Sequence, residues 1–424
     1  MARVEVSLEV GGDLTTVEDG VLKPLKMSVV AKLAYDEKLL SAGNAADTVR
    51  ATRHYDRAEA VIKVEKGGLK PSLREDRNLL VAQVDQGGTT IFSPLGPLTR
   101  EELDLVDIPA NSLLIDSLLP GTAVAVGDHW EHGDRLLAAL LGLDAVSQAD
   151  VASELVAADG QTASIELGGK LHGAIGGVAT EIELKGKYSF SFAQRRVTRL
   201  GLLIQEKRSV GHVGPGVDVV AKLMMTVAPV RAVGNLSDQT LAGLEVEPHP
   251  QATLLEYESP GGKFQLAYDR RWHIMDDRAD LLAMRLVDRG ELIAQCNVSA
   301  LPPVEPGKHV TLPKFQADIG RSLSGDFRQI REAAASEAGG LLTYRVVAEG
   351  EVAELPMRWH YYLVAGAEGR QVVFAFTVEP GLVERLAGAD EMLVSSVQFA
   401  PGQAATAARP DRVGQRAGQK VQSR

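Results

Sequence analysis

The chain has 424 residues, of which 45% are hydrophobic and 24% charged, and its 45 basic and 56 acidic side chains give a net charge of -11. At about 100 to 200 residues per domain, this predicts two or three folded, soluble domains. Acidic residues outnumber basic ones and there is no basic patch rich in aromatic residues, so nucleic acid is not an expected partner. The sequence contains no uncharged apolar window of about 18 residues, so no membrane-spanning segment is predicted.

The first residues do not fix the compartment. Residues 1–10 alternate like a strand and lack the apolar core of a signal peptide, so either the protein is cytoplasmic or an export signal was trimmed. The single cysteine, Cys296, makes no intramolecular disulfide. It lies on the apolar side of the alternating run 292–300, which predicts a buried, inert thiol; a reactive thiol is the alternative.

The first elements read as strands. Alternating runs at 4–10, 27–35, 58–64 and 79–84 are separated by glycine-rich turns, at the spacing of a meander or barrel. Thr99, followed by Glu102 at the third position, resembles a capping box and predicts a short helix. The apolar segments 113–119 and 136–143 predict further short helices, which we expect to cover the apolar side of the sheet.

The chain then returns to strands. Runs at 151–158 and 162–167 flank Asp159-Gly160, a strong hairpin signal. Residues 178–192 alternate as one long amphipathic strand, and 198–208 and 217–229 repeat the pattern. Five consecutive strands of this kind predict a large curved antiparallel sheet or open barrel, with one solvated face and one apolar face covered by short helices.

Residues 1–231 are therefore predicted to form a β-rich domain, followed by a linker at 232–253. From 254 to 400, short strands are interrupted by a helix at 312–324 and end in a helix at 382–394, which is α+β order. Residues 401–424 carry Arg and Lys without apolar periodicity and are predicted to be a disordered basic tail.

Two resemblances add to this interpretation. Residues 257–272, with Phe264-Gln-Leu-Ala-Tyr268 leading to Trp272, resemble the entry of the PsbP/Mog1-like fold, and the later order of elements also matches. This resemblance covers about residues 254–400 and implies an accessory or docking module, often extracytoplasmic, with no shared catalytic residue to carry over.

The first half is similar to a bacterial family of exported β-rich proteins of the planctomycete type. The segments that carry this likeness are Val126-Gly-Asp-His-Trp130, Glu166-Leu-Gly-Gly-Lys-Leu-His-Gly173 and Lys185-Gly-Lys-Tyr-Ser-Phe190. In strand layout alone it is also distantly similar to the LolA/LolB lipoprotein carriers, whose open barrel has an apolar interior. The start of this chain departs from both, because it shows neither a signal nor a lipobox cysteine.

The densest polar cluster is Asp128-His-Trp-Glu-His-Gly-Asp134, in which His129 and His132 are candidate metal ligands. Its glycine brackets favour a solvated turn anchored by a buried Trp130, so we expect no metal and no catalytic residue there. The glycine-rich segments fit neither dinucleotide-binding nor phosphate-binding spacing, and no cofactor is expected.

Two surfaces are candidate binding sites. On the strand 358–363, alternation places Arg358, His360 and Tyr362 on the solvated face as a candidate docking surface. The apolar face of the first domain is a candidate ligand face, or more simply its core; its residues are Ile182, Leu184, Tyr188, Leu202, Ile204, Leu223 and Met225.

We therefore expect a non-catalytic, extracytoplasmic binding or scaffold protein that recognises another protein or an envelope component, although a cytoplasmic location is not excluded by the sequence. Because no convergent set of titratable residues is evident, an enzyme is not expected. The alternatives are a carrier of a lipid or other hydrophobic ligand in the curved sheet, and a metal-dependent enzyme using His129 and His132.

Overall fold

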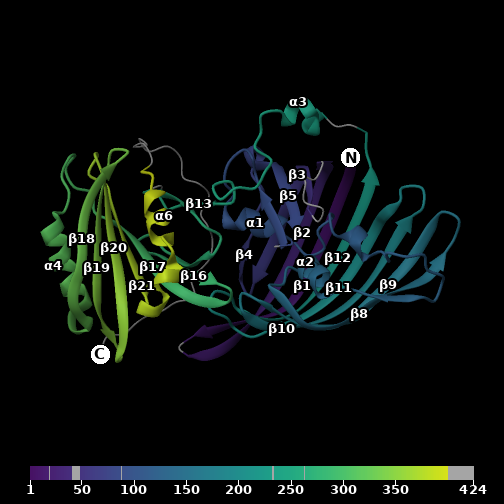
Figure 1. The fold of residues 1–424 in the computed structure, drawn as a ribbon, viewed down its shortest axis with the longest axis horizontal. Coiled ribbons are helices and arrows are strands. Elements are labelled where there is room, and N and C mark those ends of the chain that lie inside the picture. Colours follow the sequence, from purple (N-terminus) through teal and green to yellow (C-terminus); the bar gives the residue numbers. More distant parts are fainter. Residues whose placement is uncertain (19, 41–47, 87, 232–233, 262, 400–424) are drawn as a thin grey trace. The chain divides into compact units, whose positions relative to one another are not determined.

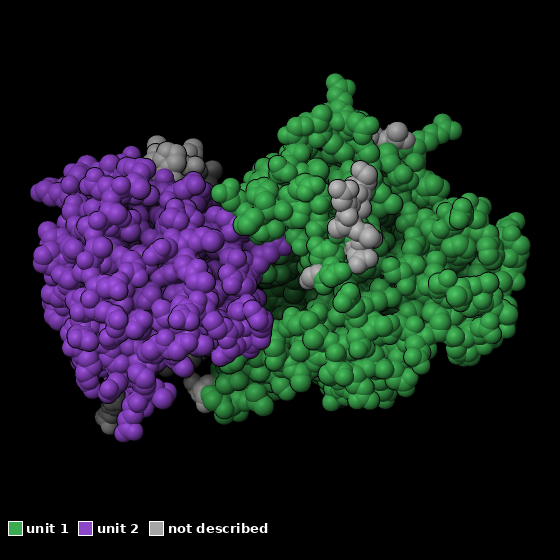
Figure 2. Space-filling model, viewed as in Figure 1, with its two compact units in different colours: residues 1–253, 406–424 green, residues 254–405 purple. Residues whose placement is uncertain are grey.

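The structure is a computed structural model that describes all residues except 19, 41–47, 87, 232, 233, 262 and 400–424. The predicted basic tail, 401–424, lies outside the described residues. The chain divides into two compact units, one formed by Met1–Thr253 and one that begins at Leu254 (Figure 2). Both are built mainly of antiparallel strands with a few short helices, so the predicted α+β class is confirmed.

The first unit contains a twelve-stranded sheet. Its strands are β1 (Ala2–Glu18), β2 (Val21–Leu40), β3 (Val49–Val64), β4 (Gly67–Leu69), β5 (Leu79–Asp85), β6 (Gly88–Phe92), β7 (His129–Glu131), β8 (Ala145–Ala158), β9 (Thr162–Ile175), β10 (Val178–Ser191), β11 (Arg196–Arg208) and β12 (Gly216–Pro229). They are ordered β6-β5-β3-β2-β1-β12-β11-β10-β9-β8-β7, and β4 pairs with β3. The long strand predicted at 178–192 is confirmed as β10.

Short helices lie against the inner face of this sheet (Figure 1). They are α1 (Arg100–Val106), η2 (Ile115–Leu118) and α2 (Asp134–Leu141), while η1 (Glu75–Arg77) precedes β5. Helix α2 buries Leu137, Leu140 and Leu141 and contacts both β6 and β8, which lie near opposite ends of the strand order. The sheet is therefore strongly curved around these helices, as a wide twisted sheet must be if its apolar face is to leave water.

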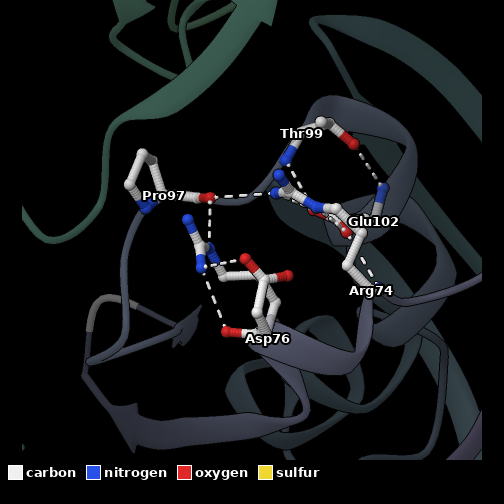
Figure 3. A network of polar contacts seen from close by, with 6 residues as sticks. Arg74, Asp76, Pro97, Thr99 and Glu102 are labelled. Atoms are coloured by element: carbon white, nitrogen blue, oxygen red, sulfur yellow. Dashed lines mark hydrogen bonds and ion pairs between the residues drawn. The ribbon is translucent and has the colours of Figure 1, made fainter. Parts of the chain in front are cut away.

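A polar network anchors α1 to the segment before β5 (Figure 3). The Thr99 hydroxyl accepts the Glu102 N–H at 3.2 Å, and the Glu102 carboxylate accepts the Thr99 N–H at 2.9 Å, which confirms the predicted capping box. The guanidinium of Arg74 donates to both carboxylate oxygens of Glu102, at 2.6 and 2.7 Å. Because the Glu102 side chain is buried, these bonds fix the entry of the helix in one place.

The segment predicted as a linker forms η3 (Gly234–Leu236) and α3 (Asp238–Leu241). It packs back on the first unit: the Lys38 ammonium donates to the Leu236 carbonyl at 3.0 Å and to Asp238 at 2.6 Å, and Arg50 pairs with Glu247 at 2.9 Å. These contacts explain why residues 234–253 group with the first unit.

The second unit has a seven-stranded sheet ordered β15-β16-β17-β21-β20-β19-β18 and a separate β13-β14 hairpin. Its elements are β13 (Leu255–Glu258), β14 (Gln265–Tyr268), β15 (Trp272–Asp277), β16 (Leu282–Asp288), β17 (Glu291–Leu301), α4 (Leu312–Leu323), η4 (Ser324–Asp326), β18 (Phe327–Ala338), β19 (Leu341–Val352), β20 (Leu355–Gly366), β21 (Gln371–Val378), η5 (Pro380–Leu382), α5 (Val383–Leu386) and α6 (Ala389–Ser395). Helices α4 and α6 lie on opposite sides of this sheet (Figure 1).

The structure refines one sequence expectation and corrects another. The closing helical segment predicted at 382–394 is present, and Ala387 and Gly388, with positive φ angles of 46° and 77°, divide it into α5 and α6. Strand β18 was not predicted at all. Its sequence is polar and rich in alanine, without the alternation of a half-buried strand, and pairing with β19 determines its conformation.

We predict that Glu102→Gln lowers the free energy of unfolding by about 2 kcal/mol at pH 7, because it removes a charge from buried hydrogen bonds. Burial alone would raise the pKa of the Glu102 carboxyl, but the bonds from Arg74 and from the Thr99 backbone outweigh burial and lower that pKa. A depressed folded-state pKa gives stability that is present above the ordinary glutamate pKa and is lost as the pH falls through the folded value.

Denaturant titrations at pH 7 and at a series of acidic pH values measure this. The difference between wild type and Glu102→Gln should shrink as the pH falls. Glu101→Gln, an exposed residue in the same helical turn, is the matched control and should stay close to wild type at every pH. A difference that is independent of pH would contradict the assignment to the Glu102 charge.

Candidate functional site

The seven residues of the candidate ligand face lie together on the inner face of the first sheet. Cross-strand pairing brings Leu184 opposite Ile204 and Leu202 opposite Leu223, so their side chains leave the same side of the sheet. All seven, from Ile182 to Met225, are exposed to 4% or less. The sequence therefore identified a continuous apolar surface that the fold removes from water.

Helix η2 and its flanks cover part of this surface. The Tyr188 hydroxyl donates to the Leu118 carbonyl at 2.9 Å, and the Trp130 indole N–H donates to the same carbonyl at 2.9 Å. The Val197 N–H donates to the Asp116 carboxylate at 2.7 Å. Directed bonds of this kind hold the short helix against the sheet, and at these seven positions the inner face is a filled core.

A buried ion pair between Arg53 and Glu37 anchors the loop at 111–112, which precedes η2. The Arg53 guanidinium donates to Glu37 at 2.9 Å and to the Ser112 hydroxyl at 3.0 Å, and it also bonds Asn111. Its carbon lies 4.9 Å from the centre of the Tyr35 ring. Because both charged side chains are only 3% exposed, each depends on these partners, and the loop at 111–112 is fixed to β2 and β3.

Beside this ion pair lies a cavity of about 10 Å³. Tyr55 contributes to its wall, and its buried hydroxyl has no hydrogen-bond partner within the described residues. Burial raises the pKa of Tyr55, so the hydroxyl stays protonated. A space of this size holds one water molecule, which would satisfy the hydroxyl, and it is too small for a metabolite or a lipid.

The polar cluster at 128–134 does not bring its histidines together. Residues 129–131 form the short strand β7, where a turn was expected. The exposed His129 side chain lies 3.2 Å from Glu154, whereas the buried His132 ring lies 2.7 Å from the Ser153 hydroxyl. No group of three or more His, Cys, Asp or Glu side chains within the described ranges is arranged to hold a metal ion.

The expected exposure of the candidate docking surface is wrong. His360 is 5% exposed and Tyr362 is 2% exposed, and Arg358 is bonded to Glu349 at 2.8 Å. The sequence alternation is right, since Trp359 and Leu363 pack against α4 on the other face. The reason for the error is α6, a segment about 30 residues further along the chain, which covers the face that was expected to meet water.

Asp390 fixes α6 on this face of the sheet through its contacts with His360 and Tyr362. Its Oδ2 atom accepts the Tyr362 hydroxyl at 2.8 Å and lies 2.7 Å from His360 Nδ1. Burial alone would raise the pKa of Asp390, but the bonds from His360 and Tyr362 outweigh burial and lower it, so the carboxylate is ionised and accepts both bonds. The Tyr362 hydroxyl in turn accepts from Arg345 at 3.1 Å.

Cys296 lies on the same covered face and is fully buried, as predicted. Burial, with a smaller contribution from the negative charge of Asp390, raises the pKa of the Cys296 thiol. A neutral, inaccessible thiol is a poor nucleophile. The inert interpretation of this cysteine therefore agrees with its surroundings.

Three exposed apolar side chains lie close together at the tip of the β1–β2 hairpin. Val17, Val21 and Leu22 are exposed to 55%, 67% and 64%. Pairing with β12 ends at Thr15, and pairing with β3 ends at Met27, so the hairpin beyond these residues is a two-stranded ribbon. Val17 and Leu22 face each other across the ribbon, while Val21 lies opposite Glu18 and therefore on its other face.

We call residues Val17, Val21 and Leu22 the hairpin tip. Sequence reasoning missed it as a site, because the strand signals extended only over 4–10 and 27–35. The signal was present in the sequence: Thr15-Thr-Val-Glu-Asp-Gly-Val-Leu22 places β-branched and apolar residues on both sides of an Asp-Gly turn.

None of the described helices has the combined length and apolarity needed to cross a bilayer.

Neither a protein-family model nor a curated protein sequence matches this chain. A solved structure from Bacteroides thetaiotaomicron is similar over 34% of this chain and 48% of its own, with 14% identity and a TM-score of 0.27. The solution structure of cyanobacterial PsbP from Synechocystis sp. PCC 6803 is similar over 41% of this chain and 99% of its own, with 14% identity and a TM-score of 0.28. These likenesses are weak, and PsbP is among them.

We predict that Leu184→Ala lowers the free energy of unfolding by about 2 to 5 kcal/mol, because it leaves a cavity in a packed core. Chemical denaturation of the full chain measures this. Lys185→Ala, at the next position on the solvated face, is the matched control and should change stability by less than about 0.5 kcal/mol. Equal stability of wild type and Leu184→Ala would mean that the inner face is not a packed core at this position.

We also predict that Asp390→Ala destabilises the second unit by about 3 kcal/mol or more, because it leaves two buried donors, His360 and Tyr362, unpaired. Unfolding of the full chain in a Trp130→Phe background, followed by the fluorescence of Trp272 and Trp359, measures this. Glu391→Ala, the exposed neighbour on α6, should stay within about 0.5 kcal/mol of wild type. An unchanged transition for Asp390→Ala would show that α6 is not held by this carboxylate.

Proposed function

We propose that this chain is a non-catalytic binding or scaffold protein that recognises another protein or envelope component through the hairpin tip. The observation that carries the proposal is the exposure of three apolar side chains, by 55 to 67%, on a ribbon to which no further strand of the described residues pairs. Exposed apolar residues gathered at one place favour a contact surface, because leaving them in water costs free energy that a partner recovers.

The stem of the ribbon supports this interpretation. Lys26 pairs with Asp13 at 2.8 Å in the stem, and Lys23 pairs with Glu18 at 2.6 Å beside Val21 at the tip. Opposite charges across the two strands keep the ribbon soluble and in register around the apolar residues. An apolar centre with a charged rim is the usual anatomy of a protein–protein contact.

The buried ionisable residues support a non-catalytic role. Glu102 holds α1, Glu37 and Arg53 hold the loop at 111–112, and Asp390 holds α6. Each of these groups already has the partners that its charge requires, and each joins a short covering element to a sheet. Such groups serve the fold, whereas catalytic groups must meet a substrate in an accessible pocket.

The proposal includes an extracytoplasmic location and a PsbP/Mog1-like fold for the second unit. Residues 254–400 resemble the PsbP/Mog1-like fold in sequence, and the first half is similar to exported bacterial proteins. Both resemblances favour an extracytoplasmic accessory protein. Fractionation of the source cells with an antibody to the chain tests the location, and recovery in the cytoplasm alone would contradict it.

A photo-reactive amino acid at position 22, introduced in the source cells, tests the hairpin tip. We expect one dominant cross-linked adduct, which excess unlabelled wild-type protein suppresses and the Val17→Ser, Leu22→Ser variant does not, because serine removes the apolar contact. A photo-reactive residue at position 220, an exposed valine within the sheet, is the matched control and should not give this adduct. The same adducts from both positions would contradict recognition by the tip.

A further inference from the structure

The imidazole of His132 is buried at the edge of the first sheet, where β7 meets β8. Strand β7 has three residues and pairs only with β8 among the described strands. The His132 N–H continues this pairing by donating to the Val151 carbonyl at 3.1 Å. Alternation turns the Trp130 and His132 side chains toward the inner face and those of His129 and Glu131 toward water. His132 is only 8% exposed, so the last ring of this edge belongs to the core.

Hydrogen bonds connect the His132 ring to η2. Its Nε2 atom lies 2.7 Å from the Ser153 hydroxyl, and Ser153 lies 3.0 Å from the hydroxyl of Tyr188. Tyr188 also bonds the Leu118 carbonyl, to which the Trp130 indole donates from β7. Ser153 and Tyr188 are each 1% exposed, and burial raises the pKa of Tyr188 to about 12, so both stay uncharged. The neutral ring therefore completes a network that carries no charge.

A proton on His132 would find no compensating charge. Burial lowers the pKa of the ring, and no charged side chain among the described residues offsets that effect. His129, which is exposed, lies 3.2 Å from Glu154 and would strengthen that pair in acid, but an exposed pair contributes little. Burying the charge of His132 is the larger effect. The other charged side chains of the surrounding elements reach solvent: Asp116 on η2, Asp128 and Glu131 around β7, Asp134 and Arg135 on α2, and Glu154 on β8.

The part of the chain that has to move for the ring to meet water is short. We call residues 127–132 the β7 segment. Besides the bond from His132, the Gly127 N–H donates to the Leu155 carbonyl at 2.8 Å, and the Leu155 N–H donates to the Asp128 carbonyl at 3.1 Å. A strand of three residues at a sheet edge is among the parts of a fold that open most readily. Its departure would leave β8, which has fourteen residues, as the edge of the sheet.

We propose that the β7 segment is an acid-sensitive switch at this edge. At neutral pH it covers β8, and protonation of His132 shifts it to an open state that uncovers the β8 backbone and releases Trp130 from Leu118. Burial determines the direction of this effect. A ring that is harder to protonate in the closed state favours the open state as the pH falls below the ordinary histidine pKa, about 6.5. The effect grows until the pH reaches the lower pKa of the closed state.

Hydrogen exchange of the full chain, followed by mass spectrometry between pH 7 and pH 5, measures the opening. After division by the intrinsic exchange rate at each pH, we expect the exchange of peptides covering 127–132 and Leu155 to rise by about fivefold or more toward pH 5. Peptides from β10 and β11 should change much less. His132→Gln keeps an N–H group near Ser153 but cannot be protonated, so its opening should not depend on pH in this range.

His129→Gln is the matched control, because it replaces the other histidine of the β7 segment, whose side chain is 62% exposed. It should keep the pH dependence of the wild type. An equal rise in exchange over all of the first unit would overturn the proposal of a local switch, and so would a wild-type opening that is independent of pH. The wild-type measurement decides both points even where His132→Gln does not fold. A pH dependence that persists in folded His132→Gln would assign the effect to another group and overturn the proposal as well.

Discussion

The interaction on which both units depend is the burial of the apolar faces of an antiparallel sheet. Alternation along the strands of the first sheet gives it one apolar face and one solvated face, and an apolar face has to be covered for a sheet to be stable. The first unit meets this constraint by curving around short helices, so that α2 contacts both β6 and β8. The second unit places a helix on each side of its sheet, α4 on one and α6 on the other. The short helices have little stability of their own, since isolated helices of this length are marginal in water, and they persist because the sheet needs them.

Apolar burial alone does not say where a short helix should sit, because it has no direction. In this protein α1, the loop at 111–112, η2 and α6 each carry at least one buried polar bond to the sheet or to a segment beside it. Glu102 binds Arg74, Ser112 binds Arg53 and Glu37, the Leu118 carbonyl binds Tyr188, and Asp390 binds His360 and Tyr362. A misplaced helix would leave these groups unpaired in a dry environment, at a cost of several kcal/mol. The buried charges therefore define positions, and the apolar contacts supply most of the stability.

This division explains what the sequence could and could not predict. Signals that act within a few residues were read correctly: the Thr99–Glu102 capping box, the Asp159-Gly160 hairpin and the alternation of β10. Contacts between distant segments could not be read from the sequence. Alternation showed that His360 and Tyr362 share a face, but whether that face meets water depends on α6, which follows 27 residues after Tyr362 and was predicted as part of a longer helix. For the same reason the pattern of Ile182 to Met225 fits a ligand face as well as the core that it more simply indicates, and only the covering helices decide between them. Strand β18 escaped prediction because its alanines and charges carry no strand signal of their own.

Once the faces are covered, the outermost strands still present backbone groups without strand partners, and the four ends of the two main strand orders differ in how they are built. The outer strands of the first sheet are short, with five residues in β6 and three in β7. In the second sheet β15 has six residues and a bulge between Ile274 and Asp276. Short strands and bulges are the ordinary ways to prevent pairing with other chains. Strand β18 has twelve residues, and its bulges are confined to its first half. Short length or a bulge therefore disfavours pairing of β6, β7 and β15 with another strand. The last six residues of β18 have neither feature.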